Sequence, residues 1–310
     1  MTTSNIVPDL VLNLIDAFRH SKTMFAAVEL GIFDGARPAE YQELARLLNA
    51  CVALGLLMKE GDLYVNTEIA DRYLSSGSPD TLAGYIRYSN RALYPMWGHL
   101  EDALREGSSR WKQVFGADGA IFDHFYQTDD AMRQFLLGMH GFGQISSPAV
   151  VAAFDLSSFE HLVDLGGATG HLAAAAQARY PRMQTTVFDL PKVAALFPHV
   201  TPGDFFTDPL PSADLYALGR ILHDWSDEKC SALLGRIYAA LPPGGGLLIA
   251  EKLLRESNLA AHMQNLNMLV VTEGRERTAE EYAALLRGAG FRQVEHRITG
   301  APLDATLGIK

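Results

Sequence analysis

The pattern of apolar and polar positions along the chain changes character near residue 155. Before that point, apolar residues recur at helical spacing, first over residues 10–30 and then over residues 43–57. A turn signal, KEGD, and a short strand-like run, LYV, follow the second of these helices. Two helices, a turn and a short hairpin are typical of a winged helix. Residues 82–150 again show helical spacing and are rich in aromatic residues and methionine.

From residue 160, strand-like runs alternate with helical runs. The strand-like runs are HLVDLG, TTVFDL, ADLYALG and LLIAEKLL, and the chain closes with FRQVEHRIT and DATLGIK. This alternation predicts βαβ units in a mostly parallel sheet. Because only GAPL joins the last two runs, these two strands must be antiparallel. We therefore expect an α/β fold with the Rossmann-like sheet of a class I methyltransferase, mostly parallel and with an antiparallel C-terminal hairpin.

These patterns divide the 310 residues into three parts. Residues 1–82 are expected to form a shortened, winged-helix-like dimerisation domain that is all-helical apart from its hairpin. Residues 83–155 form a helical region that links the domains and lines the substrate pocket, and residues 156–310 form the α/β domain. Aromatic residues and methionines of the middle part, such as Trp97, Met139 and Phe142, singly fit a helical core. As a group they indicate the wall of an apolar pocket for a flat substrate.

Composition matters mainly for what it excludes. Hydrophobic residues make up 48% of the chain and charged residues 20%, as in ordinary globular proteins. The net charge of −10 gives no general attraction to phosphate backbones or anionic lipid, which argues against nucleic acid and membrane as partners. No apolar run approaches the roughly 20 residues of a membrane span, and the N-terminus lacks the order of a signal peptide. With only Cys51 and Cys230, far apart and read as free thiols, we expect a soluble, cytoplasmic protein.

A glycine-rich turn, DLGGATG at residues 164–170, lies between a strand-like and a helical run, where α/β folds bind nucleotide-like ligands. It is not a dinucleotide fingerprint, because Ala168 and His171 stand where the second and third glycines of G-x-G-x-x-G should be. No G-x-x-x-x-G-K-[ST] sequence is present, so a P-loop is excluded as well. The turn alone is a weak signal.

Two further aspartates strengthen that signal. Asp189 ends the second strand, where its carboxylate can accept both hydroxyls of a ribose. Asp204 lies where the third strand should end, and there it can accept from an adenine amino group while Phe205 stacks on the ring. Each aspartate singly fits a turn or a helix cap. Together with Asp164 they indicate an adenosine, and without a pyrophosphate motif S-adenosylmethionine is the natural candidate.

His223 follows directly on the strand ADLYALG, on the cofactor's side of the sheet. Glu251 ends the next strand and Glu276 follows in GRERT; carboxylates can fix an imidazole's tautomer and stabilise its protonated form. A phenol has a pKa of about 10 and an imidazole one of about 6.5, so the imidazole can take the proton as the oxygen attacks a methyl group. A helix-capping role for His223 stays open, although Asp224 or Ser226 would cap equally well. No His, Asp or Glu cluster has metal-ligand spacing, so we expect no metal.

The run GDFFTDPLPSADLYALGRILHDWSDEKCSALLGRIYAALPPGGG resembles the plant-type small-molecule O-methyltransferases, and most of all their acetylserotonin O-methyltransferase branch. The resemblance continues in NLNMLVVTEGRERT, GAGF, AFDLSSFEHLVDLGG, YPMWGHLEDALREG and VELGIFD, over nearly the whole chain. It implies an S-adenosylmethionine-dependent O-methyltransferase that methylates a small aromatic or heteroaromatic, secondary-metabolite-like hydroxyl and releases S-adenosylhomocysteine. It also implies a homodimer whose N-terminal helices interlock, and an S-adenosylmethionine-binding domain over residues 156–310.

The resemblance and the residue patterns together give the predicted site. The catalytic set is His223 as base, bracketed by Glu251 and Glu276. The cofactor set is Asp164, Gly166, Gly167, Gly170, Asp189 on the ribose, Leu190, Gly203, Asp204 and Phe205 at the adenine, Arg220 beside the adenosine, and Tyr126 and Ser147 at the methionine end. The substrate set is Asp224, Asn267, Val271, Met139, Phe142 and Trp97.

The chain departs from that branch at three places. The branch has a glutamine four residues after the asparagine matched by Asn267; here the residue is Val271, which suggests an acceptor less polar than N-acetylserotonin. Gly143 stands where the branch has a tryptophan over the cofactor, which would leave extra room. Between residues 33 and 57, about one helix of the usual winged-helix domain is missing, which would leave the pocket mouth more open.

Two other functions stay open from the sequence. The same fold and cofactor can serve N-methylation, or hydroxylation, decarboxylation or rearrangement without methyl transfer; the set His223, Glu251 and Glu276 favours methyl transfer. The second is a non-catalytic winged-helix regulator that senses a ligand. The net charge of −10 and the shortened helical region count against it.

Overall fold

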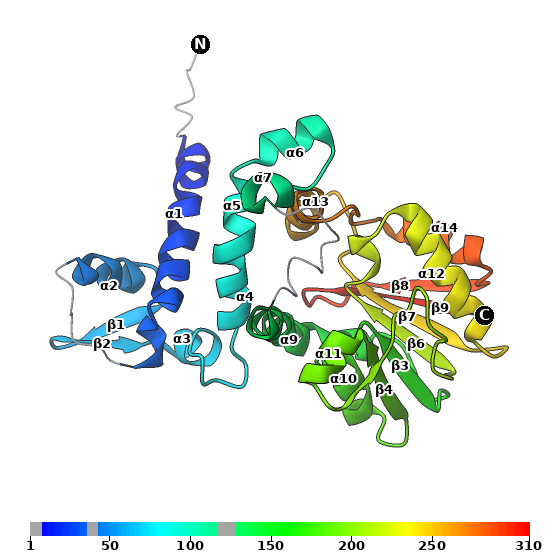
Figure 1. The fold of residues 1–310 in the computed structure, drawn as a ribbon. Helices are drawn as coiled ribbons and strands as arrows, with labels where there is room; N and C mark the ends of the chain where they lie inside the picture. The colour runs from blue at the N-terminus through cyan, green and yellow to red at the C-terminus, as the bar shows by residue number, and fades with distance from the viewer. Residues whose placement is uncertain (1–7, 36–42, 117–127) are drawn as a thin grey trace, which may run out of the picture. The chain divides into compact units, whose positions relative to one another are not determined.

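The computed structural model describes residues 8–35, 43–116 and 128–310 (Figure 1). The chain divides into two compact units, Met1–Ala92 and Leu93–Lys310. The boundaries 1–82, 83–155 and 156–310 expected from the sequence stay a prediction. Within the described residues, no helix is both long and apolar enough to cross a membrane.

The first unit is helical with one two-stranded hairpin. Its elements are α1 (Asp9–Glu29), the 3₁₀ turn η1 (Ile32–Asp34), α2 (Leu44–Ala53), β1 (Leu57–Glu60), β2 (Leu63–Asn66), α3 (Glu68–Tyr73) and α4 (Ala83–Tyr88). The helix expected over residues 43–57 is shorter than predicted, because Gly55 adopts a left-handed φ of 74° and β1 begins at Leu57. β1 and β2 pair antiparallel, which confirms the expected hairpin. A small core, including Phe33, Leu48 and Cys51, holds the unit together.

The second unit alternates strands and helices as the sequence predicts. A π-helical turn, η2 (Ser89–Leu93), lies at the junction of the units. The elements that follow are α5 (Tyr94–Trp97), α6 (Leu100–Glu106), α7 (Trp111–Phe115), α9 (Asp129–Ala152), β3 (His161–Leu165), α10 (His171–Arg179), β4 (Gln184–Asp189), α11 (Pro191–Leu196), β5 (Val200–Pro202), β6 (Leu215–Gly219), the 3₁₀ turn η3 (Leu222–Asp224), α12 (Asp227–Ala240), β7 (Gly246–Glu251), α13 (Leu259–Val271), α14 (Ala279–Ala289), β8 (Gln293–Arg297) and β9 (Asp304–Ile309).

In the described part of this unit, seven strands form one sheet in the order β5-β4-β3-β6-β7-β9-β8. The first five run parallel, and β9 is antiparallel to both β7 and β8, so the expected mostly parallel sheet with an antiparallel C-terminal hairpin is confirmed. The chain moves outward from β3 to β4 and β5 and then returns to β6 on the other side of β3. That reversal between β3 and β6 is where open α/β sheets bind ligands, at the carboxyl ends of the strands.

Both faces of the sheet are covered, as a parallel sheet requires. One apolar cluster joins it to α12 and α14 through residues such as Leu233, Ile237 and Leu286. The other joins it to α9 and α10 through residues such as Val150 and Leu172. Figure 1 shows these helix pairs on opposite sides of the strands. The central strands are almost wholly buried, so the side chains available to a ligand are those at the strand ends.

Candidate active site

The glycine-rich turn follows β3, which pairs with β6 in the sheet. Gly166 has a left-handed φ of 68°, and a Cβ there would lie 2.6 Å from Cδ1 of Ile221. Asp164, at the end of β3, is buried, and its Oδ2 accepts from the backbone N–H of Ala173 at 3.3 Å. Burial raises the pKa of Asp164 to about 7. Gly167 has no room for a side chain either, because its Cβ would lie 2.6 Å from Cγ of Asp164.

Asp189 ends β4 beside the same turn. Its Oδ2 accepts from the N–H of Ala168 at 2.8 Å, and its Oδ1 accepts from the N–H of Leu190 at 2.7 Å. Burial raises the pKa of Asp189 to about 6, against these two backbone hydrogen bonds. The carboxylate of Asp189, the residue predicted to bind the ribose, is therefore held rigidly at the end of β4. Gly170 completes the turn as the left-handed residue before α10.

Asp204 and Phe205 follow β5. Oδ1 of Asp204 accepts from the N–H of Phe206 at 2.8 Å, so this aspartate also shapes a turn, as its residue type allows. The ring of Phe205 lies against the glycine-rich turn, 3.2 Å from where a Cβ on Gly166 would be. A Cβ on Gly203 would overlap the ring of Phe188, so only glycine fits there.

Arg220 leaves β6 in an unusual backbone conformation. Its φ is 58°, and Ala168, at φ 49°, is the one other non-glycine residue in the described chain with positive φ. Nη1 of Arg220 lies 3.3 Å from Sδ of Met139, and its guanidinium lies 4.7 Å from the ring centroid of Phe142. Backbone strain of this kind clusters at functional sites. Here one instance, Ala168, lies within the glycine-rich turn after β3, and the other, Arg220, follows β6, the strand next to β3.

His223 lies in η3, immediately after β6, and only 3% of it is exposed. Its Nδ1 lies 2.7 Å from Oε1 of Glu276 and 3.3 Å from Oε2 of Glu251. Its Nε2 lies 3.6 Å from Oδ1 of Asp224. The structure thus brings together the three residues of the predicted catalytic set. Ser226, rather than His223, caps α12 by accepting from the N–H of Lys229 at 3.3 Å.

The carboxylates make this imidazole unusually basic. Burial alone lowers the pKa of His223, but the charges of Glu251, Glu276 and Asp224 outweigh burial and raise it to about 9. Burial raises the pKa of Glu251 to about 7, against the favourable charge of His223. Burial also raises the pKa of Asp224, again against His223. The surrounding carboxylates therefore favour the protonated ring, an imidazolium paired with Glu276.

The predicted substrate residues lie on the elements beside this cluster. Nε1 of Trp97, from α5, donates to Oδ1 of Asn267 on α13 at 2.8 Å. Four residues further along α13, the backbone carbonyl of buried Val271 accepts from Nε1 of Trp111 at 2.8 Å. Leu190, predicted on the cofactor side, packs with a small apolar cluster around Val193. Tyr126 lies outside the described residues.

The comparisons with known proteins now decide the family. Residues 97–292 match the profile of the O-methyltransferase domain, and residues 12–76 match that of the O-methyltransferase dimerisation domain. The chain belongs to the O-methyltransferase family. It is 41% identical over 337 residues to acetylserotonin O-methyltransferase of Gallus gallus, covering 98% of this chain and 97% of the relative.

Two solved structures support the same assignment. Human N-acetylserotonin methyltransferase in complex with SAM has a TM-score of 0.93 at 38% identity, covering 100% of this methyltransferase and 99% of that chain. PigF with SAH has a TM-score of 0.86 at 28% identity, covering 98% of this chain and 100% of that one. The expected family and fold class are confirmed.

Arg277 is a site residue of the methyltransferase that the sequence analysis missed. Its side chain is wholly buried; Nη1 donates to the carbonyl of Leu222 at 2.9 Å and Nη2 to that of Trp225 at 3.0 Å. Nη2 also lies 2.6 Å from Oδ1 of Asp227. Arg277 therefore ties the segment that carries Glu276 to the turn that carries His223. Its place next to Glu276 in GRERT was the available signal.

Glu251 and Asn265 fix the same geometry from the other sides. Oε1 of Glu251 accepts from the backbone N–H groups of Ile221 at 3.0 Å and Leu222 at 2.9 Å. Oδ1 of Asn265, on α13, accepts from the N–H of Glu276 at 3.0 Å. Glu251 is thus first a support for the η3 backbone, and Glu276 is the main partner of the imidazole.

A metal could in principle use the same three side chains. One ligand atom each from His223, Glu251 and Glu276 lie within 4.8 Å of one another, a proximity that sequence spacing did not reveal. With the pKa of His223 raised to about 9, however, both ring nitrogens carry a proton at neutral pH, so a metal would have to displace the proton on the nitrogen that it binds. The cluster therefore suits proton transfer.

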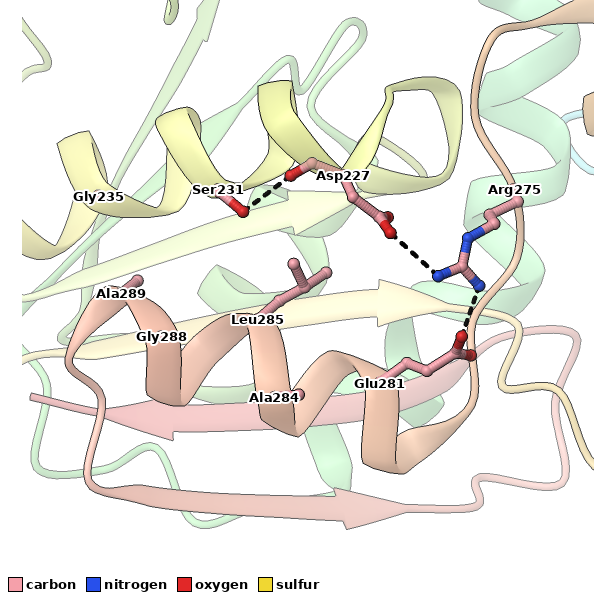
Figure 2. A pocket seen from close by; sticks show the side chains of 9 residues that line it. All are labelled: Asp227, Ser231, Gly235, Arg275, Glu281, Ala284, Leu285, Gly288 and Ala289. Carbon is pink, nitrogen blue, oxygen red and sulfur yellow. Dashed lines mark hydrogen bonds and ion pairs between the residues drawn. The ribbon is translucent and has the colours of Figure 1, made fainter.

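A separate pocket lies between α12 and α14 (Figure 2). It has a volume of about 560 Å³, and small residues such as Gly235, Ala284 and Gly288 leave its walls hollow. At its mouth, the guanidinium of Arg275 bridges Oε1 of Glu281 at 2.6 Å and Oδ2 of Asp227 at 3.2 Å. No predicted site residue lines this pocket, so it is not the candidate active site.

Ser147 makes a contact that the sequence did not predict. Its Oγ lies 2.8 Å from Nδ1 of His171, the first residue of α10. The ring of His171 fills the space beside Gly143, because a Cβ on Gly143 would overlap three atoms of that ring. The extra room expected at Gly143 is therefore absent. The reason is a residue 28 positions away along the sequence that occupies it.

Proposed function

We propose that this methyltransferase transfers a methyl group from S-adenosylmethionine to a hydroxyl of a small aromatic or heteroaromatic molecule, with His223 as the general base. The observation that supports this proposal best is the buried imidazole of His223. Its Nδ1 is within hydrogen-bond distance of Glu276, and its Nε2, on the side of Asp224, stays available to accept a proton. The relatives point the same way, since one is called an acetylserotonin O-methyltransferase and two solved structures are complexes with SAM and SAH.

The residues present fit the proposed cofactor. Two buried carboxylates, Asp164 and Asp189, flank the glycine-rich turn at the switch point of the sheet, and the Phe205 ring lies against that turn. The strained backbone of Ala168 and Arg220 borders the same place. In this proposal Asp189 binds the ribose, Asp204 and Phe205 bind the adenine, and Arg220 lies beside the adenosine. When bound there, S-adenosylmethionine supplies the electrophilic methyl group and leaves as S-adenosylhomocysteine.

His223 handles the proton of the acceptor. In the neutral ring Nδ1–H donates to Glu276, and Nε2 accepts the hydroxyl proton as the oxygen–carbon bond forms and the carbon–sulfur bond breaks. A phenol has a pKa of about 10. Because the pKa of His223 is raised to about 9, the transfer is nearly balanced in free energy. Glu276 and Asp224 then stabilise the imidazolium that results.

The reaction type is tested by its products. We expect purified enzyme, given S-adenosylmethionine and a panel of phenols and hydroxy-heteroaromatics, to form S-adenosylhomocysteine and an O-methylated product in a one-to-one ratio by mass spectrometry. An N-methylated product would instead support N-methylation. A changed acceptor without S-adenosylhomocysteine would support the non-methylating alternatives and overturn the proposal.

We further propose a homodimer formed through α1. This helix carries a dense set of exposed apolar side chains, Leu10, Leu14, Ile15 and Phe18 among them, each more than half exposed. A set of this kind marks an interaction surface, and the dimerisation-domain match includes most of α1. Light scattering should give a dimer mass for the wild type and a monomer for Phe18→Asp. His20→Asp, exposed on the opposite face of the same helix, is the matched control and should stay dimeric. A dimeric Phe18→Asp would contradict the proposal.

The proposed compartment is the cytoplasm. Cys51 and Cys230 are both buried free thiols, which fits a reducing environment.

A further inference from the structure

We propose that His171 is a cofactor-binding residue, whose ring takes the space left by Gly143 and whose Nε2–H donates to the methionine end of the cofactor. This inference rests on the proposed function, because it assigns a new residue to the same cofactor site. His171 was not among the predicted site residues. Its assignment depends on two contacts, with Gly143 and Ser147, and on the neutral charge of its ring.

The position of the ring comes first. His171 is the first residue of α10 and follows Gly170, the last residue of the glycine-rich turn. A Cβ on Gly143, on α9, would overlap Cγ, Cδ2 and Nδ1 of the ring. α9 and α10 pack side by side along their length. The imidazole thus packs between α9 and the glycine-rich turn, which the cofactor is proposed to contact.

The hydrogen bonds fix which nitrogen is free. Nδ1 of His171 lies 2.8 Å from Oγ of Ser147, whose hydroxyl can donate to it. Among the described residues, Nε2 of His171 has no hydrogen-bond partner, and the ring is only partly buried. A neutral imidazole that accepts at Nδ1 carries its proton at Nε2, so it presents a donor to a ligand. A carboxylate, such as the one at the methionine end of S-adenosylmethionine, is the natural acceptor.

The charge of the ring agrees with a cationic ligand. Burial lowers the pKa of His171 to about 4, and the charges of His140 and Arg220 act in the same direction. His171 is therefore neutral at pH 7. A neutral aromatic ring adds no repulsion to a sulfonium, whereas an imidazolium would.

The glycine-rich turn is held by a second histidine. Nδ1 of His140, on α9, lies 2.8 Å from Oγ1 of Thr169, and Gln144 holds the other ring nitrogen at 2.9 Å. The rings of His140 and His171 are 6.4 Å apart and meet edge to face. His140 is thus a positioning residue for the turn, and His171 is the one with a free donor.

Calorimetric titration with S-adenosylmethionine and with S-adenosylhomocysteine tests the assignment. We expect His171→Ala to raise the Kd for both ligands about ten-fold or more, the usual effect of losing a hydrogen bond to a charged group. His171→Gln, which retains a donor near the Nε2 position, should recover most of the affinity. The matched control is His161→Ala. Like His171, His161 lies within hydrogen-bond distance of a side-chain hydroxyl, Oγ1 of Thr186 at 2.9 Å, but it is at the opposite end of β3, and its loss should leave the Kd unchanged.

The outcomes separate this inference from the proposed function. If the wild type binds neither ligand, the proposed function fails and the inference with it. If the wild type and His171→Ala bind both ligands equally well, the inference alone is overturned. Equal losses in His171→Ala and His171→Gln would also overturn the proposed hydrogen bond.

A double-mutant cycle tests the fit of the ring against Gly143. Gly143→Ala should weaken cofactor binding in the wild-type background, because its Cβ displaces the ring of His171. In the His171→Ala background the same change should have no effect on Kd, so the two substitutions should be strongly non-additive. Additive effects would contradict a role for the ring in the cofactor wall.

Discussion

At the end of β4, both carboxylate oxygens of Asp189 accept backbone N–H groups, whereas at the other side of the switch point Glu276 places an oxygen 2.7 Å from the imidazole of His223. The proposed cofactor end thus uses its acid to shape the backbone that meets the ligand. The proposed catalytic end uses its acid to change the basicity of another side chain. Both acids are buried, Asp189 at the end of β4 and Glu276 in the loop between α13 and α14, but their partners differ.

The difference has an energetic origin. Backbone N–H groups stabilise the charge of Asp189 only in part, so burial still raises its pKa to about 6. Around His223 three carboxylates share one imidazole, and Oε2 of Glu276 has no hydrogen-bond partner in the described chain. The imidazolium is then the main compensation for buried negative charge. We therefore expect substitutions at the catalytic end, around His223, to change turnover. Substitutions at the cofactor end, around Asp189, should change the affinity for the cofactor.

The largest effect is expected from His223→Ala. Without a base, turnover should fall about 10²–10⁴-fold, while the Kd for S-adenosylmethionine should stay within a few-fold of wild type. Steady-state kinetics and calorimetry on the same preparation measure both. His262→Ala, an exposed histidine on α13, is the control. Turnover within a few-fold of wild type in His223→Ala would contradict the assignment of the base.

Glu276→Gln should have the next largest effect. The amide keeps the shape but removes the charge next to Nδ1, so the pKa of His223 should fall. At high pH, where the ring is neutral in both proteins, turnover should decrease about 10–100-fold because the base is weaker. In the wild type kcat/KM should rise with pH up to about 9, because neutral His223 is the active form. In Glu276→Gln that rise should move to lower pH. If the pH dependence of kcat/KM is the same in Glu276→Gln as in the wild type, the claim that Glu276 raises the pKa of His223 is contradicted.

At the cofactor end, Asp189→Ala should act on binding. We expect the Kd for S-adenosylmethionine and S-adenosylhomocysteine to rise at least about ten-fold, because the ribose ligand and the anchor of Ala168 are both lost. Calorimetric titration measures the Kd. Asp155→Ala, in the exposed loop before β3, provides the comparison and should leave the Kd unchanged. If Asp189→Ala binds both ligands as tightly as the wild type, the proposal that the adenosine binds at the end of β4 is contradicted.

The smallest effect concerns stability at Asp164. Its pKa is raised above the unfolded value of about 3.8 to about 7, so the folded state binds this proton more tightly. The resulting stability is present below pH 4 and is lost as pH rises through about 7. Asp164→Asn should reduce the fall in unfolding free energy between pH 5 and pH 8 by about 1–2 kcal/mol, measured by urea denaturation. Asp62→Asn, in an exposed turn, should leave the fall unchanged.

The sequence predicts most of the sheet, because the alternation of buried strands and amphipathic helices is a local pattern. It also predicts the candidates at the strand ends, such as Asp189 and His223, since parallel strands place their carboxyl ends at one edge. It misplaces the end of α2, where the single left-handed Gly55 outweighs a continuing apolar pattern.

The sequence does not predict contacts between segments that are far apart along the chain. Arg277 reaches the carbonyl of Leu222, and His171 fills the space beside Gly143. No periodicity encodes such pairs, because each depends on how two helices or loops pack in space.

The measurement that tests the account most directly is an NMR titration of the His223 imidazole in the wild type and in Glu276→Gln, with the His223→Ala spectrum to assign the signal. It needs no knowledge of the acceptor. The account predicts a pKa of about 9 in the wild type and a clearly lower value in Glu276→Gln. A wild-type pKa of about 6.5 that Glu276→Gln leaves unchanged would contradict the claim that the carboxylates make His223 the base.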